Sequence, residues 1–338
     1  MPESKLESSN PQMRAWRCHA FGDYHALALE SLPVPRPGPG EVRVAVRAIA
    51  PGFPDMLMVQ GLYQLKPPLP FTPCADFSGV VAAVGEGVTQ FRPGERVMGV
   101  VRFGAAADFL IVKASDLLPL PARFDFASGA AYLVAYKTAY VALVVRGGLK
   151  AGETLLVHGA AGGVGLAAVE LGKHLGATVI ALASSDEKRA VVRAKGADHV
   201  LDAREPRFRE AVKALTGGRG ADVVYDPVGA EVFDESLHCI AVFGRLLVVG
   251  FAGGRIPQLP VNLALLKQIS IVGVRAGEYG RQFPAGGQAV NQALVALAEA
   301  GHLTPHIHRH YGFDELVQVL DSIAAREVIG RVVMHWQE

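Results

Sequence analysis

The sequence predicts an α/β protein that combines a doubly wound parallel sheet with a second, β-rich and partly barrel-like domain. Its 338 residues are enough for about two domains of roughly 150 residues each. Residues 14–136 hold short strand-like runs rich in Val, Gly and Pro. Between residues 137 and 275, apolar strand-like runs alternate with helical patterns, as in a parallel sheet covered on both faces.

In residues 14–136, the run EVRVAVRAIA at Glu41–Ala50 alternates polar and apolar residues, as a half-buried strand does. Phe77–Gly85 and Gly94–Val101 are further predicted strands. Prolines between these runs mark loops and turns. This part is therefore predicted to be a β-rich, partly barrel-like domain.

Residues 137–275 are predicted to be the nucleotide-binding domain. Its first strand, Thr154–His158, leads into a helix at Gly163–Leu175 that carries an apolar face. A strand at Ala177–Leu182 and a helix at Glu187–Lys195 repeat the pattern. Later strands are expected at Asp198–Leu201, Asp222–Tyr225, Arg245–Val249 and Ser270–Val274.

Residues 276–338 are predicted to return to the first domain, which makes that domain discontinuous. Helices are expected at Ala289–Ala300 and Asp314–Arg326, followed by a last strand at Arg331–His335. Residues 1–13 are mostly polar and have no apolar core, which predicts a disordered tail rather than a signal peptide.

Composition narrows the class of protein. Half of the residues are hydrophobic, which supplies ample material for buried cores, and the formal net charge is +1. With no run of like charge, nothing indicates a nucleic-acid partner. The three cysteines lie far apart without a CxxC pair, which fits a reducing, cytoplasmic setting. Lys137, His158 or glycines interrupt the most apolar stretches, so we expect no membrane span.

A glycine-rich loop, HGAAGGVG at His158–Gly165, lies between a predicted strand and a predicted helix. That context is what dinucleotide binding requires, because the bare backbone lets a pyrophosphate approach the free N–H groups of the helix N-terminus. A glycine-rich turn of purely structural use is the alternative. The residues predicted to bind the cofactor here are Gly159, Ala161, Gly162, Gly163, Val164 and Gly165.

The second strand of the nucleotide-binding domain indicates which cofactor binds. NAD-binding domains usually end this strand in an acid that holds the ribose hydroxyls. Here it ends at Ala183, followed by SSDEKR, whose hydroxyls and cations suit a 2′-phosphate and favour NADPH. Two alternatives remain open: Ser184 and Glu187 form a helix capping box, or Asp186 folds back to the ribose.

A metal site is not expected. Catalytic zinc needs Cys and His ligands, and structural zinc needs about four thiolates, which three scattered cysteines do not supply. The densest histidine group is His302, His306, His308 and His310, three of which would share one face of a strand. No carboxylate or cysteine in sequence completes this group, so we expect at most weak, adventitious metal binding.

With these motifs in hand, the chain resembles the zinc-free quinone oxidoreductase branch, relatives of zeta-crystallin, of the medium-chain dehydrogenase/reductase superfamily. The matching segments are PRPGPGEVRV (Pro35–Val44), FPDMLMVQGLY (Phe53–Tyr63), AVGEGVTQFRPGERV (Ala83–Val97), LKAGETLLVHGAAGGVG (Leu149–Gly165) and VVYDPVG (Val223–Gly229). The resemblance implies a Rossmann-type domain and a GroES-like catalytic domain, a homodimer, and an NADPH cleft between the domains. It also implies reduction of quinones, enones or enoyl thioesters.

The resemblance also implies roles for single residues. Ser184, Lys188 and Arg326 match residues near the adenosine 2′-phosphate, and Thr138 with Gly250, Phe251 and Ala252 matches the nicotinamide surroundings. The chain departs from the family pattern at Gly52 (usually Asn), Leu57 (often aromatic), Cys74 and Asp76 (commonly Gly and Glu), and Ala203 (Tyr in some relatives). The first two differences suggest a more open, less polar nicotinamide pocket. Cys74 is expected to be a small buried residue rather than a reactive thiol.

Tyr63 is the candidate catalytic residue. Hydride addition to an enone or enoyl thioester leaves negative charge on the carbonyl oxygen, which a hydrogen-bond donor stabilises. Related enoyl thioester reductases carry a functional tyrosine at this position, although Tyr63 could equally only pack on its loop. Asp55 is expected to accept backbone N–H groups. The alternatives to a small-molecule reductase are a non-enzymatic, crystallin-like NADPH-binding protein and a zinc-type alcohol dehydrogenase.

Overall fold

The computed structural model describes residues 11–205 and 207–336, and its chain divides into two compact units. Among the described residues, unit 1 holds 11–131, 309–327 and 332–336, and unit 2 holds 132–308 and 328–331. Residues 1–10 of the tail predicted for 1–13 lie outside the described residues. Gln12 and Met13 belong to the first strand, so the prediction is wrong for these two.

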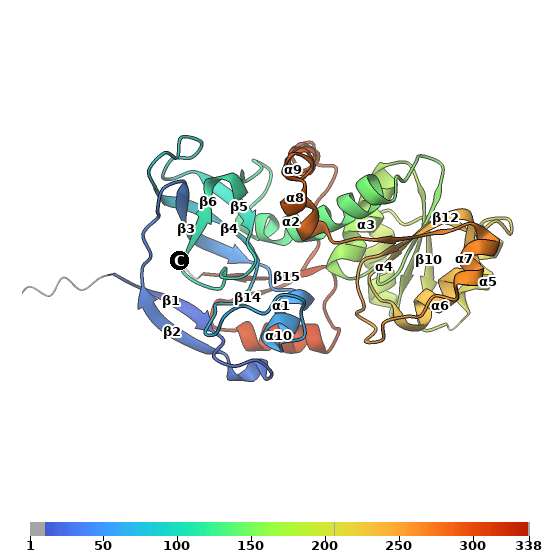
Figure 1. Ribbon diagram of the computed structural model, residues 1–338, viewed down its shortest axis with the longest axis horizontal. Helices are drawn as coiled ribbons and strands as arrows, with labels where there is room; N and C mark the ends of the chain where they lie inside the picture. Colours follow the sequence, from blue (N-terminus) through green and yellow to red (C-terminus); the bar gives the residue numbers. More distant parts are fainter. Residues whose placement is uncertain (1–10, 206, 337–338) are drawn as a thin grey trace, which may run out of the picture. The chain divides into compact units, whose positions relative to one another are not determined.

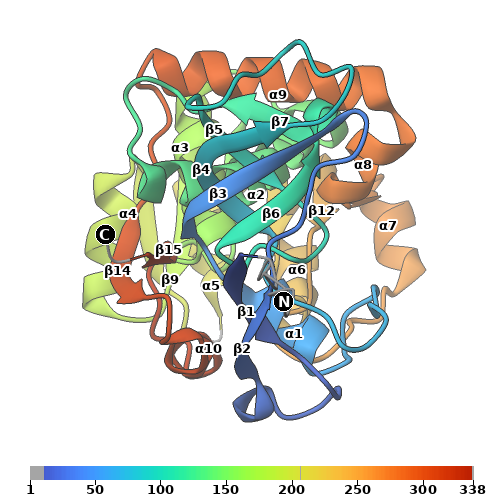
Figure 2. The same ribbon diagram turned by 90° about the vertical axis from the view of Figure 1, so that its left-hand side faces the viewer.

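Unit 1 is built on a seven-stranded sheet in the order β14-β15-β3-β4-β5-β7, with β6 paired to β3 (Figure 2). A hairpin of β1 and β2 forms a separate two-stranded sheet. Its strands are β1 (Gln12–Arg17), β2 (Ala28–Pro33), β3 (Glu41–Ile49), β4 (Asp76–Val84), β5 (Arg96–Val100), β6 (Phe109–Lys113), β7 (Leu117–Pro119), β14 (Ile307–Gly312) and β15 (Arg331–His335). Its helices are α1 (Phe53–Val59) and α10 (Leu316–Ala324), with short turns η1 (Tyr24–Ala26) and η2 (Ala114–Asp116).

The alternation predicted for Glu41–Ala50 is visible in β3, where Val42, Val44 and Val46 are buried and the residues between them are more exposed. β15 pairs antiparallel with β3, with Met334 opposite Ile49. The last strand therefore joins the sheet that begins early in the chain, as the sequence predicts.

Unit 2 contains a six-stranded parallel sheet in the order β10-β9-β8-β11-β12-β13 (Figure 1). Its strands are β8 (Thr154–Val157), β9 (Thr178–Ala183), β10 (His199–Asp202), β11 (Ala221–Asp226), β12 (Ile240–Val248) and β13 (Ser270–Gly273). Its helices are α2 (Phe126–Tyr140, which begins in unit 1), η3 (Val141–Arg146), α3 (Gly163–His174), α4 (Asp186–Ala194), α5 (Phe208–Leu215), α6 (Ala230–Cys239), α7 (Val261–Lys267), α8 (Ala276–Gln282) and α9 (Pro284–Glu299).

Helices cover both faces of this sheet because its strands are apolar on both sides. On one face, Leu156 and Ile180 pack with Phe208 of α5 and Phe233 of α6. On the other face, α3 approaches so closely that a Cβ on Gly172 would lie 2.5 Å from Leu155 Cδ2. The doubly wound architecture predicted from the alternating pattern is therefore confirmed.

The domain boundary predicted at residue 275 differs from the observed division, which keeps residues 276–308 in unit 2. The reason is local packing in this segment. The Tyr132 hydroxyl donates to the carbonyl oxygen of Leu294 in α9 at 2.9 Å. Farther along, the Thr304 N–H donates to the Glu170 carboxylate of α3 at 3.1 Å. Neither interaction leaves a signal in the periodicity of the sequence.

One helical stretch, Phe126–Arg146, is long and apolar enough to pass a length-and-composition test for a membrane span. In its most apolar 18-residue window, 61% of the residues are buried inside the protein, and core helices pass the same test. α2 was not predicted from the sequence. Its own apolar residues lie on all faces of the helix, so they produce no amphipathic period.

Candidate functional site

The glycine-rich loop connects β8 to α3 at the carboxyl end of the parallel sheet, where doubly wound folds bind ligands. Gly159 has a φ of +54°, which favours glycine. A Cβ on Gly165 would lie 2.2 Å from the Gly159 carbonyl oxygen, so only glycine allows the first turn of α3 to pack against the loop. These two glycines serve the protein's own packing.

Gly162 has a different role. It is the N-cap of α3, and no side chain caps the helix there. A Cβ on Gly162 would meet only the Gly159 carbonyl oxygen, at 3.4 Å, so the protein itself does not require glycine here. The bare backbone leaves the first N–H groups of α3, from Gly163 and Val164 onward, accessible to an anion. The residues present therefore fit a dinucleotide pyrophosphate.

Residues 328–331 complete this cradle, which the sequence analysis missed. The Gly330 N–H donates to the Ala161 carbonyl oxygen at 2.7 Å. A Cβ on Gly163 would lie 2.6 Å from Cδ of the buried Arg331. The stem of the Arg331 side chain thus packs against the first residue of α3. In sequence Arg331 only begins a predicted strand, so no local signal could have found it.

The end of β9 holds the residues predicted to select the cofactor. Ala183 is buried, Ser184 is exposed and Lys188 is half-buried. The hydroxyl of Ser185, not Ser184, caps α4 by accepting the Lys188 N–H at 3.3 Å. The capping-box alternative for Ser184 and Glu187 is therefore wrong by one residue, and the exposed Ser184 hydroxyl is available to a ligand.

Asp186 was the main alternative ligand for a ribose. Its carboxylate is fully exposed at the start of α4 and accepts from Arg189 Nη2 at 2.5 Å. Arg189 also contacts Asp202 Oδ2 at 3.0 Å. Hydrogen bonds from the side chain and the backbone N–H of Arg204, together with the charge of Arg189, lower the pKa of Asp202. Both acids near the end of β9 are thus paired with arginines.

The residues matched to the nicotinamide surroundings also lie in unit 2. Gly250, Phe251 and Ala252 follow β12, and the Ala252 N–H donates to the Pro227 carbonyl oxygen at 3.1 Å. The buried Asp226 carboxylate accepts the N–H groups of Val228 and Gly229, both at 2.9 Å, which fixes the neighbouring turn. Thr138 is half-buried in α2, and its hydroxyl donates to the Val134 carbonyl oxygen at 2.7 Å.

In unit 1, Tyr63 is half-buried just beyond α1, and its N–H donates to the Leu57 carbonyl oxygen at 3.1 Å. The buried Asp55 accepts the Gly52 N–H at 2.8 Å, which confirms it as an acceptor for the backbone. Cys74 is buried, as predicted, with a left-handed φ of 69°. Arg326 also belongs to unit 1, where it follows α10.

The histidine group of the sequence analysis is not brought together as one cluster. His310 faces His335 in unit 1, with the two rings stacked 4.6 Å apart, whereas His302 contacts His174 in unit 2. Within residues 11–205 and 207–336, no group of three or more His, Cys, Asp or Glu side chains could hold a metal ion. The three cysteines are buried and form no disulfide.

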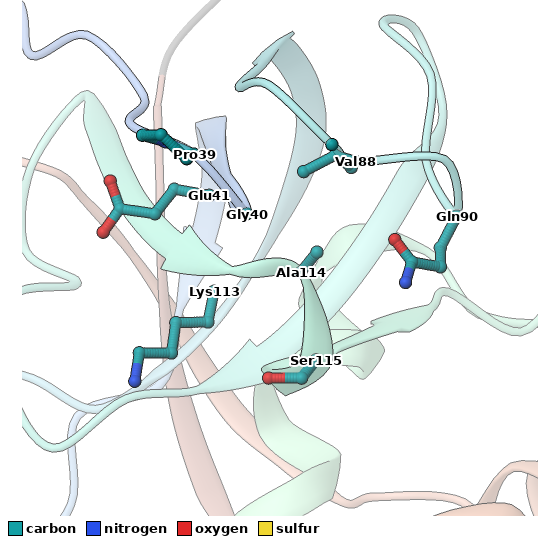
Figure 3. Close-up of a pocket in the computed structure, with 9 residues that line it drawn as sticks. Pro39, Gly40, Glu41, Val88, Gln90, Lys113, Ala114 and Ser115 are labelled. Atoms are coloured by element: carbon teal, nitrogen blue, oxygen red, sulfur yellow. The ribbon is translucent and has the colours of Figure 1, made fainter.

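A surface hollow of about 340 Å³ lies on unit 1 (Figure 3). Its charged groups are Glu41, which accepts the Gly38 N–H at 2.9 Å, and Lys113. None of the predicted site residues lines it, so we assign it no part in the chemistry. Its lining consists of Pro39, Gly40, Glu41, Gly87, Val88, Gln90, Lys113, Ala114 and Ser115.

Comparison with known proteins identifies the family of the chain. Residues 38–122 match the alcohol dehydrogenase GroES-like domain, and residues 163–292 match the zinc-binding dehydrogenase family. The chain is 37% identical to the quinone oxidoreductase-like protein 2 homolog of Nematostella vectensis, over 99% of this chain and 92% of that protein. It is 33% identical to human quinone oxidoreductase, over 92% of this chain and 94% of the relative.

The chain belongs to the quinone oxidoreductase branch of the medium-chain dehydrogenase/reductase superfamily. A mycobacterial member solved in complex with NADPH superposes with a TM-score of 0.88 at 31% identity, covering 96% of this chain and 99% of that one. The chain described by this structure is therefore an oxidoreductase with an NAD(P)-binding fold.

Proposed function

We propose that the protein is an NADPH-dependent reductase that passes a hydride to a quinone, or to an α,β-unsaturated carbonyl compound or enoyl thioester, without zinc. The proposal rests mainly on the residue types found at the end of β9. There the buried Ala183 stands where an NAD-binding acid is usual, and Ser184 is exposed. Asp186, the nearest acid, is paired with Arg189.

The cofactor supplies the hydride, and the side chains of this protein bind and orient it. The first turn of α3 receives the pyrophosphate, and the stem of Arg331 packs beside Gly163. Ser184 and Lys188 receive the 2′-phosphate. The mycobacterial relative was solved with NADPH, which supports the same choice here. The matching of Arg326 to the 2′-phosphate and of Thr138 to the nicotinamide rests on the family resemblance.

Tyr63 would act on the substrate. Its hydroxyl would donate to the oxygen that gains negative charge, or supply the proton to the α carbon. A quinone depends less on this donor, because its reduced form is a stable anion. Gly52 and Leu57, which replace an Asn and an aromatic residue of the family pattern, would leave room for a larger or less polar substrate.

A turnover panel tests the proposal. Oxidation of NADPH is followed against a set of quinones, enals and enoyl-CoA esters, with NADH in parallel. We expect turnover of at least one class, with NADPH preferred. Binding of NADPH without turnover of any class would instead favour a non-enzymatic, crystallin-like protein.

Independence from zinc has its own test. Protein stripped with a chelator should keep its turnover, and elemental analysis should find no stoichiometric zinc. The absence of a suitable ligand group among residues 11–205 and 207–336 supports this part of the proposal. Activity that disappears on stripping and returns with zinc would indicate a zinc-type alcohol dehydrogenase instead.

We also propose that two copies associate through unit 2. β13 lies at the end of the strand order of the described sheet, and α7 exposes Val261, Leu265 and Leu266, each more than 70% accessible. An unpaired strand edge beside apolar side chains favours self-association. Light scattering should give the mass of a dimer, and Leu265→Glu with Leu266→Glu should give a monomer. An unchanged mass in this double variant would rule out this surface.

A further inference from the structure

A cationic cluster of unit 2 lies beyond the end of β13, at the carboxyl edge of the parallel sheet. It consists of Arg275, Arg281, Lys137 and Glu278. The Val274 N–H donates to the Val248 carbonyl oxygen at 2.9 Å, so the chain after β13 runs beside the end of β12. Arg275 comes next and begins α8. In this fold, ligands bind at the carboxyl edge. Arg275 is therefore one strand away from Gly250–Ala252, the segment matched to the nicotinamide.

Two positively charged side chains lie close to the backbone of α8. A Cβ on Gly277 would lie 3.3 Å from Nη2 of Arg281, so glycine eases the close approach of this guanidinium group. A Cβ on Gly280 would lie 3.9 Å from Nζ of Lys137, an ordinary van der Waals distance. Lys137 comes from α2, where it precedes Thr138.

The cluster carries an excess of positive charge. Glu278 supplies the carboxylate of the cluster, and it accepts hydrogen bonds from Nε and Nη2 of Arg281 at 3.2 and 3.1 Å. Arg275 reaches the same oxygen only at 3.8 Å, and 64% of its side chain is exposed. Two guanidinium groups therefore share one carboxylate oxygen. Arg275 can turn toward an external anion while Arg281 keeps its hydrogen bonds to Glu278.

This positive charge is too far from the end of β9 to serve the 2′-phosphate of the cofactor. In the order β10-β9-β8-β11-β12-β13, four strand spacings separate β9 from β13. At about 4.8 Å each, they amount to roughly 19 Å. Ser184 and Lys188 lie beyond β9, whereas the cluster lies beyond β13. The cluster therefore suits a second anion, at the nicotinamide side of the sheet.

We propose that Arg275 and Arg281 form a subsite for an anionic group of the substrate, remote from the carbon that accepts the hydride. The inference rests on the proposed reductase function and narrows its substrate class to anionic enones or enoyl thioesters. The anion is either a phosphate of an acyl-CoA or a carboxylate of a small acid. Guanidinium groups bind both in the same way, through paired N–H donors.

The test compares charged substrates with neutral partners of the same reactive group, at saturating NADPH. Crotonyl-CoA is paired with S-crotonyl-N-acetylcysteamine, and 4-oxopent-2-enoate with pent-3-en-2-one. Arg275→Ala and Arg281→Ala should each raise KM for a charged substrate about threefold to tenfold, as expected for a partly exposed charge-assisted contact. The neutral partners should change less than about twofold, and Arg275→Lys should recover part of the loss.

Arg219→Ala is the matched control, because Arg219 makes the same kind of exposed i,i+3 pair with Asp222, at 2.7 Å, near the opposite edge of the sheet. It should change none of the four KM values. A response limited to crotonyl-CoA identifies the phosphate source, and a response limited to 4-oxopent-2-enoate identifies the carboxylate source. Equal KM changes for charged and neutral partners would mean that the arginines only support the fold, and would overturn the subsite.

A binding measurement separates this inference from the proposed activity. Calorimetry follows butyryl-CoA, which has no reactive double bond, into the NADPH-saturated protein and into the Arg275→Ala variant. If no substrate turns over but butyryl-CoA binds wild type several-fold more tightly than the variant, the subsite stands and the reductase proposal fails. If wild type and variant bind butyryl-CoA alike, and no 4-oxopent-2-enoate effect is seen, the subsite is wrong whatever the activity.

Discussion

Gly165 packs so closely on Gly159 that a Cβ at residue 165 would lie 2.2 Å from the Gly159 carbonyl oxygen. Three residues earlier, a Cβ on Gly162 would approach the same oxygen only to 3.4 Å. Two glycines of one motif thus have separate purposes. Gly165 is required by the fold, whereas Gly162 leaves space in front of the helix for a ligand.

Gly165→Ala and Gly162→Ala should therefore fail in different ways. Gly165→Ala should lower the free energy of unfolding by roughly 1–3 kcal/mol, the range for an overpacked site. Gly162→Ala should unfold within about 0.5 kcal/mol of wild type, because its φ of −77° and ψ of 169° suit alanine. Its NADPH dissociation constant should rise about tenfold or more, equivalent to ~1.4 kcal/mol. Urea unfolding and fluorescence titration measure the two effects, and identical behaviour of the variants would contradict this division.

Lys188→Ala should weaken NADPH binding about tenfold to a hundredfold, the effect of losing one charge-assisted contact to the 2′-phosphate. NADH, which lacks that phosphate, should bind nearly as before. The measurement is the dissociation constant of each cofactor for both proteins. Lys173→Ala is the control, since Lys173 is an exposed lysine of unit 2 that pairs with Asp198. Equal affinity of the wild type for NADPH and NADH, or tighter NADH binding, would refute the proposed preference.

Tyr63→Phe should lower kcat on an enone or enoyl ester about tenfold to a thousandfold, the range for removing one acid or oxyanion donor. The loss on a quinone should be smaller, and NADPH affinity should barely change. Tyr24→Phe is the control in unit 1, because its hydroxyl donates to Asp321 at 3.0 Å on the surface. A wild-type rate for Tyr63→Phe on enones would assign the proton to water or to the cofactor, and Tyr63 to packing.

The protein should lose stability as the pH falls below about 6.5, and His158 should contribute to that loss. Burial lowers the pKa of His158. Between this lowered pKa and the ordinary one, His158 is protonated in the unfolded chain and neutral in the folded chain. Stability from the neutral imidazole is therefore complete above the ordinary pKa and is lost as the pH falls toward the folded-state value. The ring is neutral at neutral pH, with Nε2 donating to Ser236 Oγ at 2.6 Å, since that hydroxyl itself donates to Val232.

His158→Gln should flatten this pH dependence by up to about 1.4 kcal/mol per pH unit, the maximum for one proton. Unfolding by urea at pH 7 and at pH 5 measures it. The exposed His174→Gln should leave the wild-type slope in place. Burial also lowers the pKa of His306 and His335, so part of the slope should remain in His158→Gln. Parallel slopes for wild type and His158→Gln would contradict the assignment.

The fold could be predicted from the sequence to the extent that its elements carry a local period. β3 alternates, β8 and β9 are short apolar runs, and α3 begins at the glycine motif, so each was predicted within a few residues of its observed bounds. α2 was missed because it is apolar on all sides. The segment 276–308 was assigned to the wrong part of the chain, because single hydrogen bonds such as Tyr132 to Leu294 hold it in unit 2.

By itself, the sequence determined the family, the parallel-sheet fold, the position of the glycine loop and the lack of an acid at Ala183. These are properties of residue type and spacing along the chain, and they do not depend on which segments meet. Only the tertiary structure decided that Arg331 lies against Gly163, that Ser185 rather than Ser184 caps α4, and that Arg189 holds Asp186. It also placed Lys137 beside α8. Such contacts join residues that the backbone path brings together, so no pattern within one segment encodes them.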